Sequence, residues 1–196
     1  MLDKVAKRCV VFAKPYTMQV KSELNFKSIQ IDGTRVQLVS ITRKYSEIIF
    51  SEFTDEITRY MIPATPENIQ EIDTFINTSL LKMDQGTDII LVILDRQTGE
   101  FLGVCGVHGQ PNPDEPILGI WLKKSAHGNH YGQEAMSHLV GWLRDNISFI
   151  HLVYPCDKDN IASRKVAEQL GGVIFHEGQT KSMSGTVLNE VAYKIL

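Results

Sequence analysis

The sequence is poor in cysteine, and its three cysteines lie far apart. They are Cys9, Cys105 and Cys156, an odd number with no C-x-x-C spacing. This pattern argues against a disulfide framework and against a thiolate zinc site, and it is typical of a chain kept in a reducing compartment. We therefore expect a cytoplasmic protein that holds no metal.

The sequence also lacks a long apolar run and a large excess of either charge. No stretch approaches the roughly 20 apolar residues that a helix needs to span a bilayer. The short apolar run near the N-terminus is closed by Lys14, so it is a poor match to a signal peptide. A net charge of −3 offers no field for nucleic acid or an anionic membrane, and we expect neither as a partner.

Two well-known phosphate-binding motifs are absent. Without G-x-G-x-x-G the dinucleotide fingerprint is not supported, and without G-x-x-x-x-G-K-[ST] a Walker A loop is excluded. The sequence does contain a polar glycine loop, "HGNHYG" at residues 127–132, directly before an amphipathic segment. The first amides of a helix have no internal partner, and the helix dipole adds partial positive charge there. The loop is therefore a candidate anion site.

Strand and helix patterns are interspersed along the chain. Asp32-Gly33 between two β-rich runs predicts a hairpin. Two helical segments follow, the second with Thr65 as N-cap and Pro66 at its first helical position. Three strands come next, then a helix, one strand over 147–155, a helix and two final strands. This order predicts a mixed α/β (α+β) fold and not a doubly wound parallel sheet.

Two segments carry a family resemblance, "LGIWLKKSAHGNHYGQEA" at 118–135 and "NIASRKVAEQLGGVIF" at 160–175. They resemble the [RQ]-x-x-G-x-[GA] loop and the N-x-x-S…LG helix of the GNAT superfamily of acetyl-CoA-dependent N-acetyltransferases, most of all its RimJ/RimL type. The resemblance covers residues 30–196 and implies a mostly antiparallel sheet flanked by helices on both faces. Residues 1–29 are then an N-terminal extension, a candidate for one or two additional short strands.

The resemblance also implies a cofactor site. The loop amides would hold the pyrophosphate of coenzyme A, with acetyl-CoA as co-substrate and no metal. A backbone N–H of the strand at 120–122 would stabilise the oxyanion. The cofactor-binding residues implied in this way are Ile120, Trp121, Leu122, His127, Gly128, Asn129, His130, Tyr131, Gly132, Gln133, Asn160 and Ser163.

Three positions depart from the family pattern. His127 stands where Arg or Gln is usual, and His130 stands where the middle glycine is usual. A side chain at that glycine position fits if its φ is negative. Ala167 stands where many superfamily members have a tyrosine acid. The two histidines allow a metal pair, a general base, plain loop residues, or the interpretation that we favour, imidazoles beside a phosphate.

Ser163 is the candidate acid for the leaving thiolate, because it matches the serine of N-x-x-S; its alternative is an ordinary first-turn serine. Asn160 is a candidate for contact with pantetheine, for a helix N-cap, or for both. Glu115, just before the strand at 117–122, is a candidate base, and its alternative is an exposed loop carboxylate. Cys105 and Cys156 fit small core residues better than nucleophiles.

The function that these features predict is transfer of an acetyl group from acetyl-CoA to a primary amine by direct attack. The acceptor would be a protein N-terminus or a small-molecule amine. One alternative is a CoA-binding or regulatory module without catalysis, and another is a nucleotide-binding regulatory domain. The sequence leaves open whether the chain acts as a monomer or as a homodimer.

Overall fold

A computed structural model describes residues 17–196. Within the N-terminal extension it forms one short strand, β1 (Gln19–Val20), which pairs antiparallel with β7 (Ile147–Ser148). The amide of Met18 also donates to the carbonyl of Gly86 at 2.9 Å. Any further strand predicted before residue 17 lies outside the described residues.

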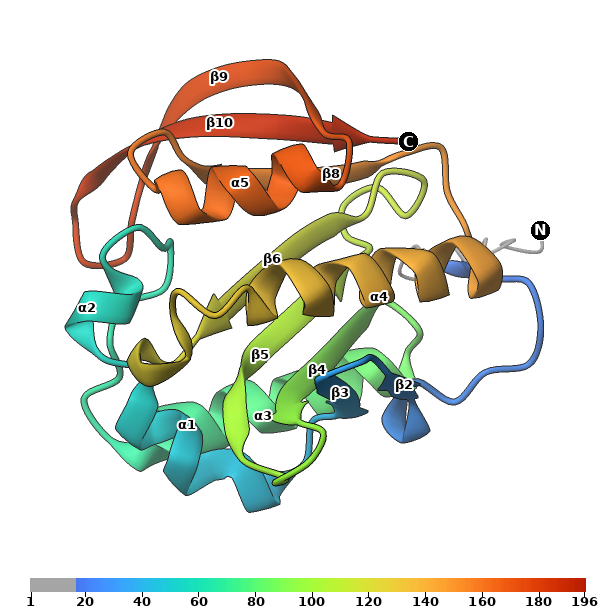
Figure 1. The fold of residues 1–196 in the computed structure, drawn as a ribbon, viewed down its shortest axis with the longest axis horizontal. Coiled ribbons are helices and arrows are strands. Elements are labelled where there is room, and N and C mark those ends of the chain that lie inside the picture. The colour runs from blue at the N-terminus through green and yellow to red at the C-terminus, as the bar shows by residue number, and fades with distance from the viewer. Residues whose placement is uncertain (1–16) are drawn as a thin grey trace, which may run out of the picture.

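A mixed sheet of eight strands forms the middle of the molecule (Figure 1). Its strands are β2 (Gln30–Asp32), β3 (Val36–Ser40), β4 (Asp88–Asp95), β5 (Phe101–His108), β6 (Ile117–Leu122), β8 (Leu152–Asp157), β9 (Val173–Lys181) and β10 (Val187–Ile195). They lie in the order β2-β3-β4-β5-β6-β8-β10-β9. Neighbours pair antiparallel except β6 and β8, which are parallel. The predicted mixed, mostly antiparallel sheet is confirmed.

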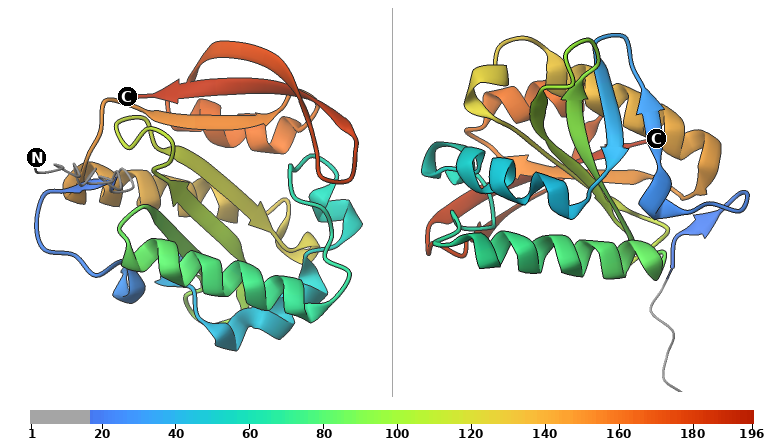
Figure 2. Two further views of the ribbon diagram at one scale, coloured as in Figure 1. Left: turned by 180° about the vertical axis from the view of Figure 1, so that it is seen from behind. Right: turned by 90° about the horizontal axis from the view of Figure 1, so that it is seen from below.

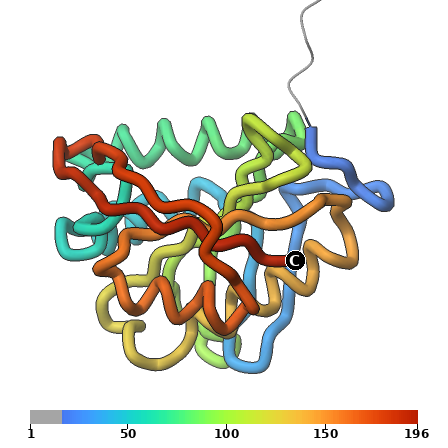
Figure 3. The backbone as a smooth tube through the Cα atoms, turned by 90° about the horizontal axis from the view of Figure 1, so that it is seen from above, coloured from blue at the N-terminus to red at the C-terminus, as the bar shows by residue number. Residues whose placement is uncertain are grey.

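Helices cover both faces of this sheet (Figures 2 and 3). They are α1 (Ser46–Glu52), α2 (Asp55–Thr58), α3 (Ile69–Asp84), α4 (Tyr131–Asn146) and α5 (Ile161–Gln169), with 3-10 turns at Phe26–Ser28, Arg43–Tyr45 and Lys124–Ala126. α1 and α3 lie on one face, and α4 and α5 lie on the other. The apolar stripe predicted along α4 is confirmed, because its members are at most 1% exposed: Ala135, Met136, Leu139, Val140 and Leu143.

The predicted start of α3 is wrong by one turn. The helix begins at Ile69 after an extended N-cap residue, Asn68, and not at Thr65–Pro66. The hydroxyl of Thr65 instead lies 2.8 Å from that of Thr58 and ties the connection back to α2. Asn68 donates from Nδ2 to Oε1 of Glu71 at 2.9 Å, but its side chain accepts from no backbone amide, so it forms no capping box.

The single strand predicted at 147–155 is two strands, β7 and β8. The break has a visible cause outside the main sheet, because the amide of Ile150 donates to the carbonyl of Asp114 at 2.7 Å. An amide bonded to that loop cannot continue the ladder of either strand. β7 therefore pairs with the N-terminal extension, and β8 enters the main sheet.

β6 and β8 begin side by side and then diverge. Within residues 17–196, the one registered pair between them is Ile117 with Val153, and the amide of Val153 donates to the carbonyl of Pro116 at 2.9 Å. Past that pair the two parallel strands part, and the N-termini of α4 and α5 lie over the opening (Figure 1). Because α4 follows β6 and α5 follows β8, the fold brings both predicted motifs to this place.

Candidate active site

A cavity of about 640 Å³ lies at the divergence of β6 and β8. It is bounded by β6, the loop before α4, the start of α5 and the segment 56–61 that contains most of α2. Of the twelve predicted cofactor-binding residues, all but Asn129 line it: Ile120, Trp121, Leu122, His127, Gly128, His130, Tyr131, Gly132, Gln133, Asn160 and Ser163. Residues more than 40 positions apart in sequence thus meet around one cavity.

The loop before α4 holds two residues in the left-handed region. Gly128 has φ 77°, and His130, the N-cap of α4, has φ 61° and ψ 12°. The negative φ on which the fit of His130 depended is therefore not found. Its ring Nδ1 lies 2.6 Å from Oε1 of Gln133, so the side chain folds over the first turn of the helix. His127 turns elsewhere, because its Nε2 lies 3.0 Å from the carbonyl of Leu122.

Replacing His130 by glycine is expected to stabilise the protein by about 1 kcal/mol, since glycine adopts this backbone conformation without the penalty of a Cβ. The same change uncovers the first amides of α4, so we expect coenzyme A to bind several-fold more tightly. Urea unfolding and calorimetric titration with coenzyme A measure the two effects. A His130→Ala variant, which keeps the Cβ, is the matched control and should show no such gain in stability.

Glu134, in the first turn of α4, ties the loop to the β2–β3 hairpin. Its carboxylate accepts from the amide of Arg35 at 2.6 Å, from Nε of Arg35 at 2.8 Å and from the amide of Val36 at 3.3 Å. Burial alone raises the pKa of Glu134, but the hydrogen bonds and charge of Arg35, with the Val36 amide, outweigh burial and lower it. Glu134 is therefore ionised and holds the mouth of α4 in place.

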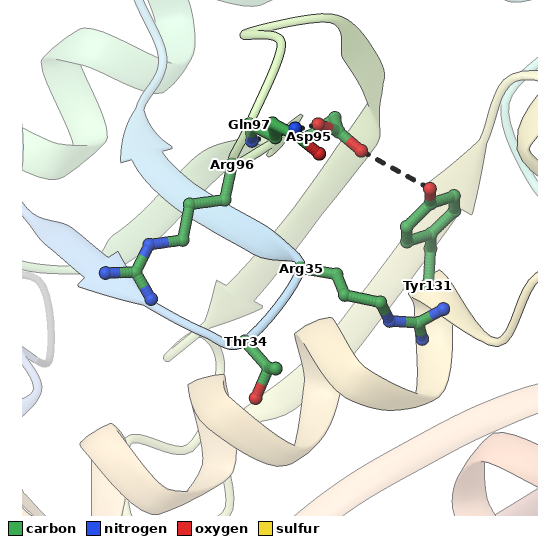
Figure 4. Close-up of a pocket in the computed structure, with 6 residues that line it drawn as sticks. All are labelled: Thr34, Arg35, Asp95, Arg96, Gln97 and Tyr131. Carbon is green, nitrogen blue, oxygen red and sulfur yellow. Dashed lines mark hydrogen bonds between the residues drawn. The ribbon is translucent and has the colours of Figure 1, made fainter.

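A second contact set braces the same loop from the side of β4 (Figure 4). The hydroxyl of Tyr131 donates to Asp95 at 3.3 Å, and the guanidinium of Arg35 lies 5.0 Å from the centre of the Tyr131 ring. These side chains border a small cavity of about 340 Å³. Arg96, beside it, donates to the carbonyl of Gly33 at 2.5 Å. We interpret this region as a support for the loop.

Asn160 and Ser163 begin α5 on the opposite side of the large cavity. Asn160 is the N-cap, and its Oδ1 accepts from the amide of Ser163 at 3.1 Å. Oγ of Ser163 lies 3.0 Å from the hydroxyl of Tyr154 in β8. Tyr154 is only 1% exposed yet also lines the cavity. Tyr154 was not among the predicted site residues, because the family pattern places its tyrosine on α5, where the buried Ala167 stands.

Burial sets the protonation of the groups around Ser163. It raises the pKa of Tyr154 far above the ordinary value, so this phenol is neutral at physiological pH. Burial likewise raises the pKa of Cys156 to about 11 and that of Cys105 to about 12. Both cysteines are therefore thiols at neutral pH, and the thiolate that nucleophilic attack requires is scarce. Of these residues, Ser163 and Tyr154, which carry the two hydroxyls, are the ones that line the cavity.

The backbone of β6 presents amides to the opening. The amide of Lys123 donates to Leu102 in β5 at 2.8 Å, which fixes the alternation of the antiparallel ladder. The amides of Trp121 and Gly119 consequently point toward β5 as well. Those of Ile120 and Leu122 point the other way, toward the divergence from β8. Of the three residues predicted to supply the oxyanion donor, only Ile120 and Leu122 therefore have an amide that points toward the opening.

Glu115, the predicted base, lies apart from this cavity. It precedes β6 at the end remote from the α4 loop, it is not among the cavity-lining residues, and its side chain is 42% exposed. Its carboxylate is 3.9 Å from Nδ1 of His151. The geometry therefore fits the alternative of a loop carboxylate better than a role at the β6–β8 opening.

Over residues 17–196, no group of three or more His, Cys, Asp or Glu side chains is arranged to hold a metal ion. In the same part of the chain, every helix is too short or too polar to cross a membrane.

The mixed sheet, with its strands diverging beside the cavity, is the fold of the GNAT acetyltransferases. The chain belongs to the family described as acetyltransferase (GNAT) domain, which matches residues 35–173. Two curated relatives come from Bacillus subtilis (strain 168). The uncharacterized N-acetyltransferase YjdG is 28% identical over 87 residues, 44% of this chain and 52% of its own. The uncharacterized protein YkkB is 33% identical over 79 residues, 39% and 46% respectively. The chain spans about half the length of these relatives.

Solved structures share the fold over most of the chain. An acetyltransferase from Salmonella typhimurium, described as modifying the N-terminal serine of a 50S ribosomal subunit protein, has a TM-score of 0.76 at 16% identity and covers 86% of this chain and 99% of its own. The microcin C7 self-immunity acetyltransferase MccE, in complex with acetyl-CoA and AMP, has a TM-score of 0.75 at 20% identity. The match covers 87% of this chain and 96% of MccE. RimL in complex with coenzyme A has a TM-score of 0.71 at 17% identity, and the match covers 85% of this chain and 98% of RimL. At these identities the likeness shows the fold, which this chain shares with RimL among other acetyltransferases.

Proposed function

We propose that the protein transfers the acetyl group of acetyl-CoA to a primary amine by direct attack. The observation that carries the proposal is the meeting of three parts on one cavity. These are the amides at the mouth of α4, the outward amides of β6, and the hydroxyl pair of Ser163 and Tyr154. They suit a pyrophosphate, a carbonyl oxygen and a leaving sulfur respectively.

The cavity residues fit coenzyme A. Its volume, about 640 Å³, falls within the roughly 300–1,000 Å³ of ordinary ligand pockets. The amides of Tyr131, Gly132 and Gln133 open α4 and have no acceptor within the helix. Gly132 faces Ile120 and Leu122, and a Cβ there would stand 3.5 Å from Leu122. The glycine therefore leaves room between the helix mouth and β6.

Bound acetyl-CoA would supply a thioester whose carbonyl carbon accepts the amine nitrogen while its C–S bond breaks. In the proposed mechanism the amide of Ile120 or Leu122 donates to the carbonyl oxygen as negative charge develops there. The hydroxyl of Ser163 gives a proton to the departing sulfur, and neutral Tyr154 orients that hydroxyl through their 3.0 Å contact. Asn160 fixes the first turn of α5, and so the position of Ser163.

The acceptor is proposed only as a class. The amine would be a protein N-terminus or a small molecule; the first is the acceptor class of RimL, described as a ribosomal L7/L12 alpha-N-protein acetyltransferase. The cavity wall formed by Glu56, Arg59 and Tyr60 comes from α2 and the turn after it. These side chains of mixed character are the first candidates for selecting the acceptor.

Thiol release from acetyl-CoA, measured over a panel of amines and N-terminal peptides, tests the proposal. Ser163→Ala is expected to lower kcat by about 100-fold, and Tyr154→Phe by less, with coenzyme binding retained in both. Ser148→Ala, an exposed serine in β7, is the matched control. Coenzyme A binding without turnover of any amine would contradict the enzyme and support the non-catalytic module. Stabilisation by ATP or NAD but not by coenzyme A would support the nucleotide-binding alternative.

A further inference from the structure

Asp88 and His108 form a polar pair on the sheet, away from the lining of the large cavity. Asp88 begins β4 and His108 ends β5, and the two residues are cross-strand partners. Asp88 is 2% exposed. Its Oδ2 lies 2.7 Å from Nδ1 of His108 and 3.3 Å from Nζ of Lys82, and its buried Oδ1 has no hydrogen-bond partner among residues 17–196.

The charge on Asp88 fixes the tautomer of His108. Burial raises the pKa of Asp88, but the hydrogen bond and charge of His108, with those of Lys82, outweigh burial and lower it. The carboxylate is therefore ionised and can only accept, so Nδ1 of a neutral His108 carries the hydrogen. Nε2 is then left with its lone pair. The His108 side chain is 42% exposed, so solvent reaches the imidazole.

The strand alternation places His108 on the α1–α3 face of the sheet. Trp121 packs on that face against Phe53, the residue after α1, with ring centres 4.8 Å apart. Gly119 shares the face of Trp121, and its cross-strand partner Gly106 shares the face of His108. Nε2 of His108 lies 3.3 Å from the point where a Cβ on Gly106 would stand, so the ring leans along β5 toward this glycine pair.

Gly119 leaves the sheet bare beside the opening, whereas the space over Gly106 is filled by the Ile90 side chain, whose Cδ1 lies 2.8 Å from the point where a Cβ on Gly106 would stand. A Cβ on Gly119 would meet no atom of residues 17–196 within 4 Å. Gly119 is followed directly by Ile120, whose amide points into the divergence of β6 and β8. The coenzyme cavity is bounded by α4 and α5 on the opposite face, and Trp121, on the same face as Gly119, also lines it. A group resting on Gly119 therefore reaches the proposed carbonyl position through the plane of the sheet.

We propose that His108 is the general base for the acceptor amine, which binds over Gly119, and that Asp88 is its positioning residue. The inference rests on the proposed function. Nε2 of His108 takes one proton from the ammonium, directly or through one water, and passes it to solvent. The nitrogen lone pair then forms the C–N bond, and the C–S bond breaks. The nitrogen loses its second proton and the departing sulfur gains one, so the protons of this step balance.

The chemistry of the acceptor calls for such a base. An N-terminal amine has an ordinary pKa near 8 and a lysine amine one near 10.4, so both are largely ammonium at neutral pH. Two charged groups face His108 from the elements around it, Asp88 of β4 and Lys82 of α3. Asp88 would stabilise the imidazolium that forms, and Lys82 shares the same carboxylate oxygen and limits that effect.

The test compares His108→Gln and Asp88→Asn with the unsubstituted full chain, using two acceptors over a range of pH. One acceptor is a strongly basic alkylamine, and the other is a weakly basic amine already neutral at the assay pH. For the alkylamine we expect kcat/KM to fall about 100-fold in His108→Gln, with loss of the limb of the pH profile that reports the base. The neutral amine should lose little. Asp88→Asn should shift that limb.

His176→Gln, an exposed histidine of β9, is the matched control and should leave both rates unchanged. Gly119→Ala should raise KM for the acceptor while coenzyme binding and the unfolding temperature stay the same, and it covers the case in which a charge variant folds poorly. A His108→Gln variant with the unsubstituted rate and pH profile for the alkylamine would overturn the inference alone. Absence of turnover in the unsubstituted protein would overturn the proposed function as well.

Discussion

Replacing Gly103 by alanine is expected to lower the free energy of unfolding by about 3 kcal/mol, because it forces an atom into close-packed backbone. A Cβ at this position would stand 2.2 Å from the carbonyl oxygen of Trp121 and 2.8 Å from Cα of Leu122. Both atoms belong to the main chain of β6, so no change of rotamer relieves the clash. β6 must move, and with it the strand that presents the amides of the site.

Urea unfolding of Gly103→Ala measures this loss, and coenzyme A binding to the folded fraction should weaken with it. Gly141→Ala is the matched control. Gly141 lies within α4 and an added Cβ meets nothing within 4 Å, so alanine should raise stability by up to about 1 kcal/mol. A Gly103→Ala protein as stable as the unsubstituted chain would show that β5 and β6 are less closely packed than described.

The second large effect is expected from Glu134→Ala. The substitution removes the acceptor of two backbone amides and one guanidinium, those of Arg35 and Val36. Leaving such groups without a partner costs about 2 kcal/mol. The first turn of α4 also loses its fixed position, so coenzyme A should bind at least about tenfold more weakly. Calorimetric titration and urea unfolding measure the two losses, with Glu23→Ala, at an exposed position, as control.

This contribution of Glu134 depends on pH in a definite direction. Its pKa is lower in the folded chain than the ordinary value, because Arg35 and the Val36 amide outweigh the effect of burial. The stabilisation is therefore full above the unfolded-state pKa and is lost as the pH falls through the folded-state pKa. The stability difference between the unsubstituted chain and Glu134→Ala should shrink in acid. A difference that grows in acid would contradict the ion pair.

The sequence predicted those parts of the molecule that depend on local pattern. The Asp32-Gly33 hairpin and the stripe from Ala135 to Leu143 follow from turn chemistry and helical period, and both are confirmed. The loop predicted to bind the cofactor lines the large cavity, and it could be singled out because its residues are contiguous. The N-cap of α3 was misplaced, since Thr65 satisfies the local rule but bonds to Thr58 instead.

The remaining site features depend on contacts between distant segments. Tyr154 matters because β8 passes under the first turn of α5, and a strand tyrosine carries no signal of that contact. The pairing of Asp88 with His108 follows from the register of β4 and β5, which is set by the connection between them. The left-handed backbone of His130 was missed for another reason, because a positive φ is uncommon for any residue other than glycine.

The parting of β6 and β8 also has a mechanical meaning. The sheet has two stiff halves, one formed by the strands from β2 to β6 and the other by β8, β10 and β9. Within the sheet they are joined at the pair of Ile117 and Val153. Contacts between α4 and α5 connect the two halves on one face of the sheet. A ligand bound between β6 and β8 would hold the two halves together. Amide hydrogen exchange along the edges of β6 and β8 that face each other should therefore slow more than exchange in the interior of either half.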